Sequence, residues 1–214
     1  MALKVVESGR IILSNADYLH VTPYVSENEI SEQTYDIVSI VGDTLSFTPD
    51  DNTVNSKEWE FGDTPLVENI TLGKIQFAAT CVDFQNDVLK TLMGWTTDDT
   101  KGVAYAPNSY KDLYAVLEVG FKNEDVVVVV PKLKLNAKAV ISTMKTGTGE
   151  GMLAGTCYNA KLSTDKDTTG AETPMAIIKT GTDGNKTYTV EIVGKGSATI
   201  TIGGSTDPSW TAES

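Results

Sequence analysis

Side chains that carry most enzyme chemistry are scarce in this 214-residue chain, which has one histidine, His20, one arginine, Arg10, and two cysteines. Most acid–base, triad and zinc chemistry would therefore have to run through His20. Paired carboxylates are the histidine-free alternative, but the acidic residues are scattered through turns. We therefore expect a protein that is not an enzyme and that has no catalytic, cofactor or metal site.

The cysteines and the apolar runs set two further limits. Cys81 and Cys157 are too few for a disulfide framework and lack CxxC spacing, so we expect both to be buried. The longest apolar run is residues 126–130, whereas a membrane helix needs about 20 residues. No apolar block of signal-peptide length follows the charged residues Lys4, Glu7 and Arg10. These features favour assembly in the cytoplasm.

Negative charge is in excess, because 29 acidic residues oppose 17 basic ones for a formal net charge of −12. Residues 1–100 hold 17 acids and 5 bases, whereas residues 101–214 hold 12 of each, so the whole excess lies in the first half. Recruitment of nucleic acid by a basic surface is disfavoured. The excess either keeps loops soluble or forms a surface that repels phosphate.

Short alternating or β-branched runs, separated by Gly, Asp, Asn and Pro, predict a mainly β chain with hairpin turns at 123–125 and 194–196. The expected strands are 35–41, 45–48, 58–61, 72–82, 113–121, 126–130, 132–141, 152–160, 175–179, 187–193 and 198–202. Residues 143–151 and 163–172 are expected to be flexible loops, because they lack the spacing of a phosphate-binding motif. Trp210, in a polar tail, packs either on its own domain or on a neighbour.

One segment in the middle of the chain has helical spacing. Asp83 suits an N-cap, and Gly94 suits the position after a helix end. The apolar positions between them are Phe84, Val88, Leu89, Leu92 and Met93. We expect this stripe to pack on a sheet. The predicted fold is a single-domain antiparallel β-sandwich or barrel, flanked by one short α-helix, with an extended loop or hairpin at 42–67 and with C-terminal strands and a flexible tail in 161–214.

The predicted strand 132–141 alternates apolar residues with Lys132, Lys134, Asn136 and Lys138. The three lysines would share one exposed face. Two interpretations are open. The lysines mark a charged edge that prevents aggregation, or they form a cationic strip that meets the acidic surface of another copy.

Five features follow one another along the chain. They are the polar stretch that ends in Glu58-Trp59-Glu60-Phe61-Gly62-Asp63, the strand through Gln76-Phe77-Ala78-Ala79-Thr80-Cys81, the helix closed by Gly94-Trp95, the strand 113–119 and the lysine-bearing strand that opens with Pro131-Lys132-Leu133-Lys134-Leu135. In this order, over roughly residues 30–160, the chain resembles the major tail tube proteins of long-tailed bacteriophages.

The resemblance implies a structural virion protein of the phage tail, assembled in the host cytoplasm. Its subunits would form rings, usually of six, that stack into a tube. The tube would enclose the tape-measure protein, meet tail terminator and tail tip proteins, and conduct DNA without binding it tightly and without inserting into a membrane.

The resemblance also implies that the early hairpin, with Trp59 and Phe61, contacts an adjacent subunit or ring. A lumen that passes DNA should expose acids and amides, so Lys132, Lys134 and Lys138 are expected to face a neighbour or the outside. Two other functions remain open: the inner tube of a bacterial injection system, and a surface β-sandwich that binds a polysaccharide or protein.

Overall fold

The computed structural model describes residues 16–37, 40–59, 62–71, 73–82, 86–109, 112–121, 126–140, 150–164, 167–179, 187–201 and 209–212. Strands predominate in these residues. They are β1 (Ala16–Ser26), β2 (Glu29–Ile30), β3 (Tyr35–Asp36), β4 (Ser46–Pro49), β5 (Thr53–Trp59), β6 (Gly62–Thr71), β7 (Ile75–Cys81), β8 (Thr96–Asp98), β9 (Val103–Tyr105), β10 (Leu113–Phe121), β11 (Val126–Val140), β12 (Glu150–Tyr158), β13 (Ala160–Thr164), β14 (Asp167–Thr173), β15 (Ala176–Lys179), β16 (Thr187–Ile192), β17 (Gly196–Thr201) and β18 (Ser209–Ala212). The helix α1 spans Asn86–Thr91.

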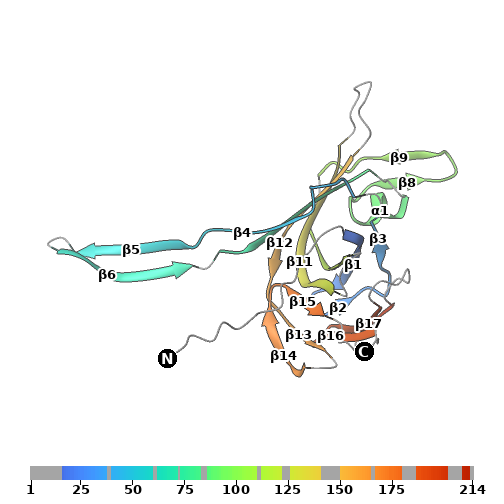
Figure 1. Ribbon diagram of the computed structural model, residues 1–214. Helices are drawn as coiled ribbons and strands as arrows, with labels where there is room; N and C mark the ends of the chain where they lie inside the picture. The colour runs from blue at the N-terminus through green and yellow to red at the C-terminus, as the bar shows by residue number, and fades with distance from the viewer. Residues whose placement is uncertain are drawn as a thin grey trace.

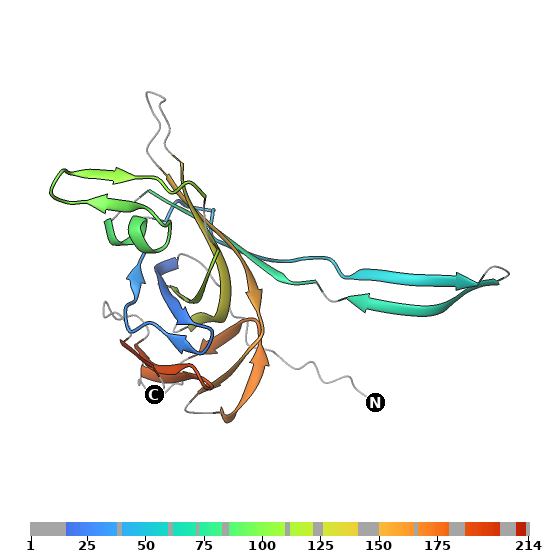
Figure 2. The same cartoon turned by 180° about the vertical axis from the view of Figure 1, so that it is seen from behind.

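Two sheets form the body of the molecule. The large sheet has the order β2-β1-β10-β11-β12-β7-β4, with β3 beside β1 and β15 beside β11. The second sheet has the order β14-β13-β16-β17-β18. The ladders within both sheets are antiparallel, which confirms the predicted mainly β, antiparallel architecture. Two hairpins project from opposite sides of this body: β5–β6 on one side and β8–β9, next to α1, on the other (Figures 1 and 2).

The central strands β10 and β11 bury both of their faces over residues 115–121 and 126–130. On one face, Leu117, Val119 and Val128 join a cluster that also contains the buried side chains of the α1 region. On the other face, Val116, Val127 and Val129 join a second cluster with residues of the second sheet. Because successive strand residues point to opposite faces, the apolar run 126–130 supplies both clusters.

The helix ends at Thr91, two residues earlier than predicted, and α1 packs together with the turn after it through part of the apolar stripe that the sequence indicated. Val88, Leu92 and Met93 are each at most 3% exposed and belong to the first cluster. Gly94 follows with φ 70°, the left-handed conformation that glycine adopts easily after a helix. Phe84 and Asp83 lie outside the described residues, as does the side chain of Leu89.

The predicted break between strands 126–130 and 132–141 is wrong, because β11 is one strand from Val126 to Val140. Pro131 lies where the register with β10 shifts, between the pairs Leu117↔Val130 and Ala115↔Leu133. A proline has no N–H to donate to the ladder and is tolerated at such an irregularity. β11 is also not an edge strand, since it lies between β10 and β12, so the interpretation of its lysines as edge protection is wrong.

The C-terminal part is more ordered than expected. The segment 163–172, expected to be a loop, contains the end of β13 and most of β14, and these strands pair with each other. Part of the expected flexible tail forms β18, which pairs with β17. Trp210 of β18 is 2% exposed and belongs to the second cluster, so it packs on its own chain.

We expect Leu92→Asp to lower the free energy of unfolding by several kcal/mol, because a carboxylate would enter the first cluster without a partner. Thermal or denaturant unfolding of the purified variant measures the change. Lys90→Asp, at an exposed position of α1, is the matched control and should unfold close to the parent. An unchanged melting temperature for Leu92→Asp would show that this segment does not pack as described.

Candidate functional site

The hairpin β5–β6, which we call the arm, is a two-stranded extension of the chain. Its strands pair in register from Thr53↔Thr71 to Trp59↔Gly62, with shifts between Lys57 and Trp59. Within the described residues, neither strand of the arm pairs with a strand of the body. Both views show the arm running away from the two sheets (Figures 1 and 2).

The base of the arm is fixed to the large sheet by backbone and side-chain hydrogen bonds. The Asp50 N–H donates to the Lys74 carbonyl at 2.8 Å, and the Gly73 N–H donates to Asn52 Oδ1 at 2.9 Å. Gln76 Nε2 donates to Asp50 Oδ2 at 2.6 Å. A side chain at position 73 would approach the Asp50 carbonyl oxygen to 1.9 Å, so this close contact requires glycine. The two chains therefore leave the sheet together.

The expected hairpin at 42–67 is present with different bounds. Residues 46–49 belong to the large sheet as β4, and the arm itself is 53–59 and 62–71. The return strand β6 was missed because it contains a proline and two acids, which are rare in strands. Trp59 lies at the end of β5, where its backbone pairs with Gly62. Phe61 lies outside the described residues.

The structure places Lys132, Lys134 and Lys138 on the outer face of the large sheet. The alternate residues Leu133, Leu135 and Ala137 are buried in the first cluster. Lys134 Nζ lies 2.8 Å from Asp112 Oδ2. Hydrogen bonding between these two groups lowers the pKa of the Asp112 carboxyl and raises the pKa of the Lys134 ammonium.

Two tyrosines lie among these lysines. The Lys132 ammonium is 5.0 Å from the centre of the Tyr114 ring, and the Lys74 ammonium is 4.5 Å from the centre of the Tyr158 ring. The two rings meet edge to face, with their centres 6.2 Å apart. Such cation–π contacts order long lysine side chains on a sheet surface.

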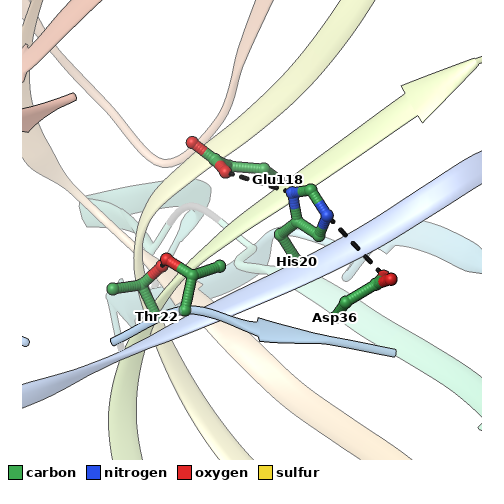
Figure 3. Close-up of polar contacts among 5 residues, drawn as sticks. His20, Thr22, Asp36 and Glu118 are labelled. Atoms are coloured by element: carbon green, nitrogen blue, oxygen red, sulfur yellow. Dashed lines mark hydrogen bonds and ion pairs between the residues drawn. The ribbon is translucent and has the colours of Figure 1, made fainter. Parts of the chain in front are cut away.

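His20, which the sequence analysis singled out, lies on β1 between two acids. Its Nε2 is 3.6 Å from Asp36 Oδ1 on β3, and its Nδ1 is 3.8 Å from Glu118 Oε2 on β10 (Figure 3). The Tyr18 ring stacks on the imidazole at 4.4 Å. Tyr18 fits there because Gly120 has no side chain, and a Cβ at that position would come within 2.1 Å of the Tyr18 ring.

Glu118 is the functional group that the sequence analysis missed. Its side chain is enclosed between the sheets at 0% exposure, and burial raises the pKa of its carboxyl from 4.5 to about 8. Neither carboxyl oxygen has a hydrogen-bond partner among the described residues. At neutral pH the carboxyl therefore retains its proton for most of the time. The sequence pattern of β10 did not predict a buried acid, because Glu118 has the spacing of an ordinary outward-facing strand residue.

No group of three or more His, Cys, Asp or Glu residues among those described is arranged to hold a metal ion. In the same part of the chain, no helix has the length and apolarity to cross a membrane. Cys81 and Cys157 are both buried, and burial raises the pKa of the Cys157 thiol to about 11.

We expect Glu118→Gln to change how stability depends on pH. The folded-state pKa of Glu118, about 8, lies above its ordinary value of 4.5, so its contribution is fully present below about pH 4.5. This contribution is lost as the pH rises towards 8. Glutamine has no such proton to lose. The variant should therefore gain stability relative to the parent between pH 5 and 9, by up to several kcal/mol, in denaturant unfolding measured across this range.

The exposed residue Glu32 provides a matched control, since Glu32→Gln removes the same charge at the surface. Its stability curve should run parallel to that of the parent. A parallel curve for Glu118→Gln would instead show that the Glu118 carboxyl ionises normally in the folded protein.

Comparison with known proteins gives a distant structural similarity. No family model and no curated protein matches the chain. Among solved structures, the chain is similar to a chain in the structure of the phage P2 baseplate in its activated conformation with Ca, at a TM-score of 0.31 and 14% identity. The match covers 69% of this chain and 48% of that chain, so this protein spans about half of the length of the baseplate chain. A TM-score this low does not establish a shared fold.

Proposed function

We propose that this protein is a structural subunit of a bacteriophage tail, which assembles with copies of itself into rings that stack as a tail tube. The observation that carries the proposal is the arm, which extends from the body and pairs only with itself in the described residues (Figure 1). A two-stranded hairpin alone is at best marginally stable in water. An arm of this kind is expected to pack on another molecule.

An arm that projects from one side of a body favours a head-to-tail contact. The arm of one copy would meet a different surface on the next, and a contact of this type generates closed rings or open filaments. Rings of six would follow the arrangement implied by the resemblance to tail tube proteins. The order of elements along the chain supports the same assignment.

The channel of such a tube would enclose the tape-measure protein and later conduct DNA. The acidic excess of residues 1–100 supports this role, because a wall that repels phosphate would not retain the genome by counterion release. Tail terminator and tail tip proteins would cap the two ends. The protein would act without a catalytic group or a cofactor.

Electron microscopy of the purified protein tests the proposal. We expect rings or hollow tubes whose fraction rises with concentration. Monodisperse monomers at high concentration would overturn the proposal and favour a surface binding module. Tubes produced from a gene that lies among injection-system genes would reassign the protein to the inner tube of such a system.

Removal of the arm should abolish stacking without unfolding the body. The deletion would replace residues 53–72 with two glycines, since Asn52 and Gly73 are already joined by a hydrogen bond and a two-residue turn can connect paired strands. Sedimentation should find the variant in the soluble fraction. Its melting temperature, measured by thermal unfolding, should lie near that of the parent.

Trp59→Ala is the milder companion variant and should weaken assembly in the same assay. A matched deletion at the tip of the β8–β9 hairpin, residues 99–102, should still assemble. If chains without the arm form tubes of normal length and at a normal rate, the subunit contact lies elsewhere.

A further inference from the structure

We propose that the outer face of β11 and its neighbouring strands is the surface that receives the arm of a second copy of this chain. We call it the Lys–Tyr face and define it by Lys74, Tyr114, Lys132, Lys134, Lys138 and Tyr158. The inference rests on the proposed function and identifies the second half of the contact that the arm requires.

Strand register brings these residues together. Lys134 of β11 pairs with Tyr114 of β10 on one side and with Thr156 of β12 on the other. Lys132 pairs with Tyr158 of β12. Residues directly opposite each other on neighbouring strands point to the same face. The set therefore forms one continuous exposed surface on the central strands, away from the edges of the sheet.

The composition of this surface suits contact with a protein. Tyr114 is 41% exposed, and Met152, which pairs with Lys138, is 49% exposed. Tyrosine and methionine are enriched at protein interfaces, and tyrosine is a common anchor of binding energy. The contacts of Lys132 and Lys74 with the tyrosine rings hold these side chains in place, so less conformational entropy would be lost on binding.

Charge indicates the arm as the occupant. Residues 53–71 contain Lys57 against Glu58, Glu60, Asp63 and Glu68, which is one positive and four negative charges for a net of −3. The Lys–Tyr face carries four lysines, and the acid that pairs with them, Asp112, is bonded to Lys134. Opposite charges on the two surfaces would guide the encounter and fix its register.

Geometry excludes the arm of the same chain. The arm leaves the large sheet beyond β4 and β7 and runs away from β10 and β11 (Figures 1 and 2). It cannot fold onto its own Lys–Tyr face while its base keeps the hydrogen bonds of Asp50 and Gly73. The arm and the face are different surfaces of one chain, so their contact between copies is head-to-tail.

A charge-swap experiment on the full chain tests the inference. The face variant is Lys132→Glu with Lys138→Glu, which leaves the Lys134–Asp112 pair intact, and the arm variant is Glu58→Lys with Glu68→Lys. A third protein combines all four changes. The control, Lys90→Glu with Lys101→Glu, makes the same change in charge on α1 and the β8–β9 hairpin, away from both surfaces.

The measured quantity is the critical concentration for assembly, from sedimentation at low and high salt. We expect the face and arm variants each to raise it about tenfold at low salt, with a smaller effect at high salt. The combined protein should recover most of the loss, and the control should match the parent. A photo-crosslinking residue at Tyr114 in the otherwise unchanged chain should form crosslinks to peptides from residues 53–71 of another copy.

The outcomes separate this inference from the proposed function. If the face variant assembles like the parent while the arm deletion does not, the arm docks elsewhere and this inference alone is wrong. If the face variant assembles normally but its tubes bind DNA differently, the face is a DNA contact and the inference is also wrong. Crosslinks from Tyr114 to other segments would overturn it even if a charge variant failed to fold. Normal assembly without the arm would also overturn this inference, whereas a parent chain that stays monomeric at high concentration would overturn the proposed function.

Discussion

The pairing of β10 with β11 is the interaction on which the rest of the structure depends. Both strands are covered on two sides over the segment where Leu117 to Gly120 pairs with Val127 to Val130. One side packs against the cluster that holds the helix, and the other packs against the second sheet. The position of the other strands of the body therefore depends on this pair, because they either pair with it in the large sheet or pack against it through one of the two clusters.

β11 is buried on both faces at its start and on one face only after Pro131, and its exposed part forms the candidate functional surface. Its first five residues are buried on both faces. Beyond Pro131 the second sheet no longer covers β11. Every second residue there is polar, and most of these are lysines, while the residues between them remain buried in the first cluster. The same strand thus builds the interior and the Lys–Tyr face, and the arm leaves from the far edge of the same sheet. A shift in this sheet would change both surfaces together.

The sequence predicted the elements whose pattern is simple. β7 and β10 alternate or are continuously apolar, and the helix has a clear stripe, although α1 ends at Thr91, three residues before the glycine that was expected to follow it directly. It did not predict β1, because polar residues of that strand, His20 and Thr22, are buried between sheets instead of facing water. Pro131 indicated a break, but the register shift with β10 accommodates it. Glu118 could not be distinguished from a surface acid, since only the covering second sheet makes it buried.

The most direct test of the central claim, that the arm joins copies of this chain, is a cryo-electron microscopy map of the assembled protein. The account predicts a tube in which each arm lies on the neighbouring copy, across the outer face of β11, with Lys132, Lys134 and Lys138 covered by that contact. A map in which the arm folds back on its own body, or in which the three lysines point into the channel, would contradict it.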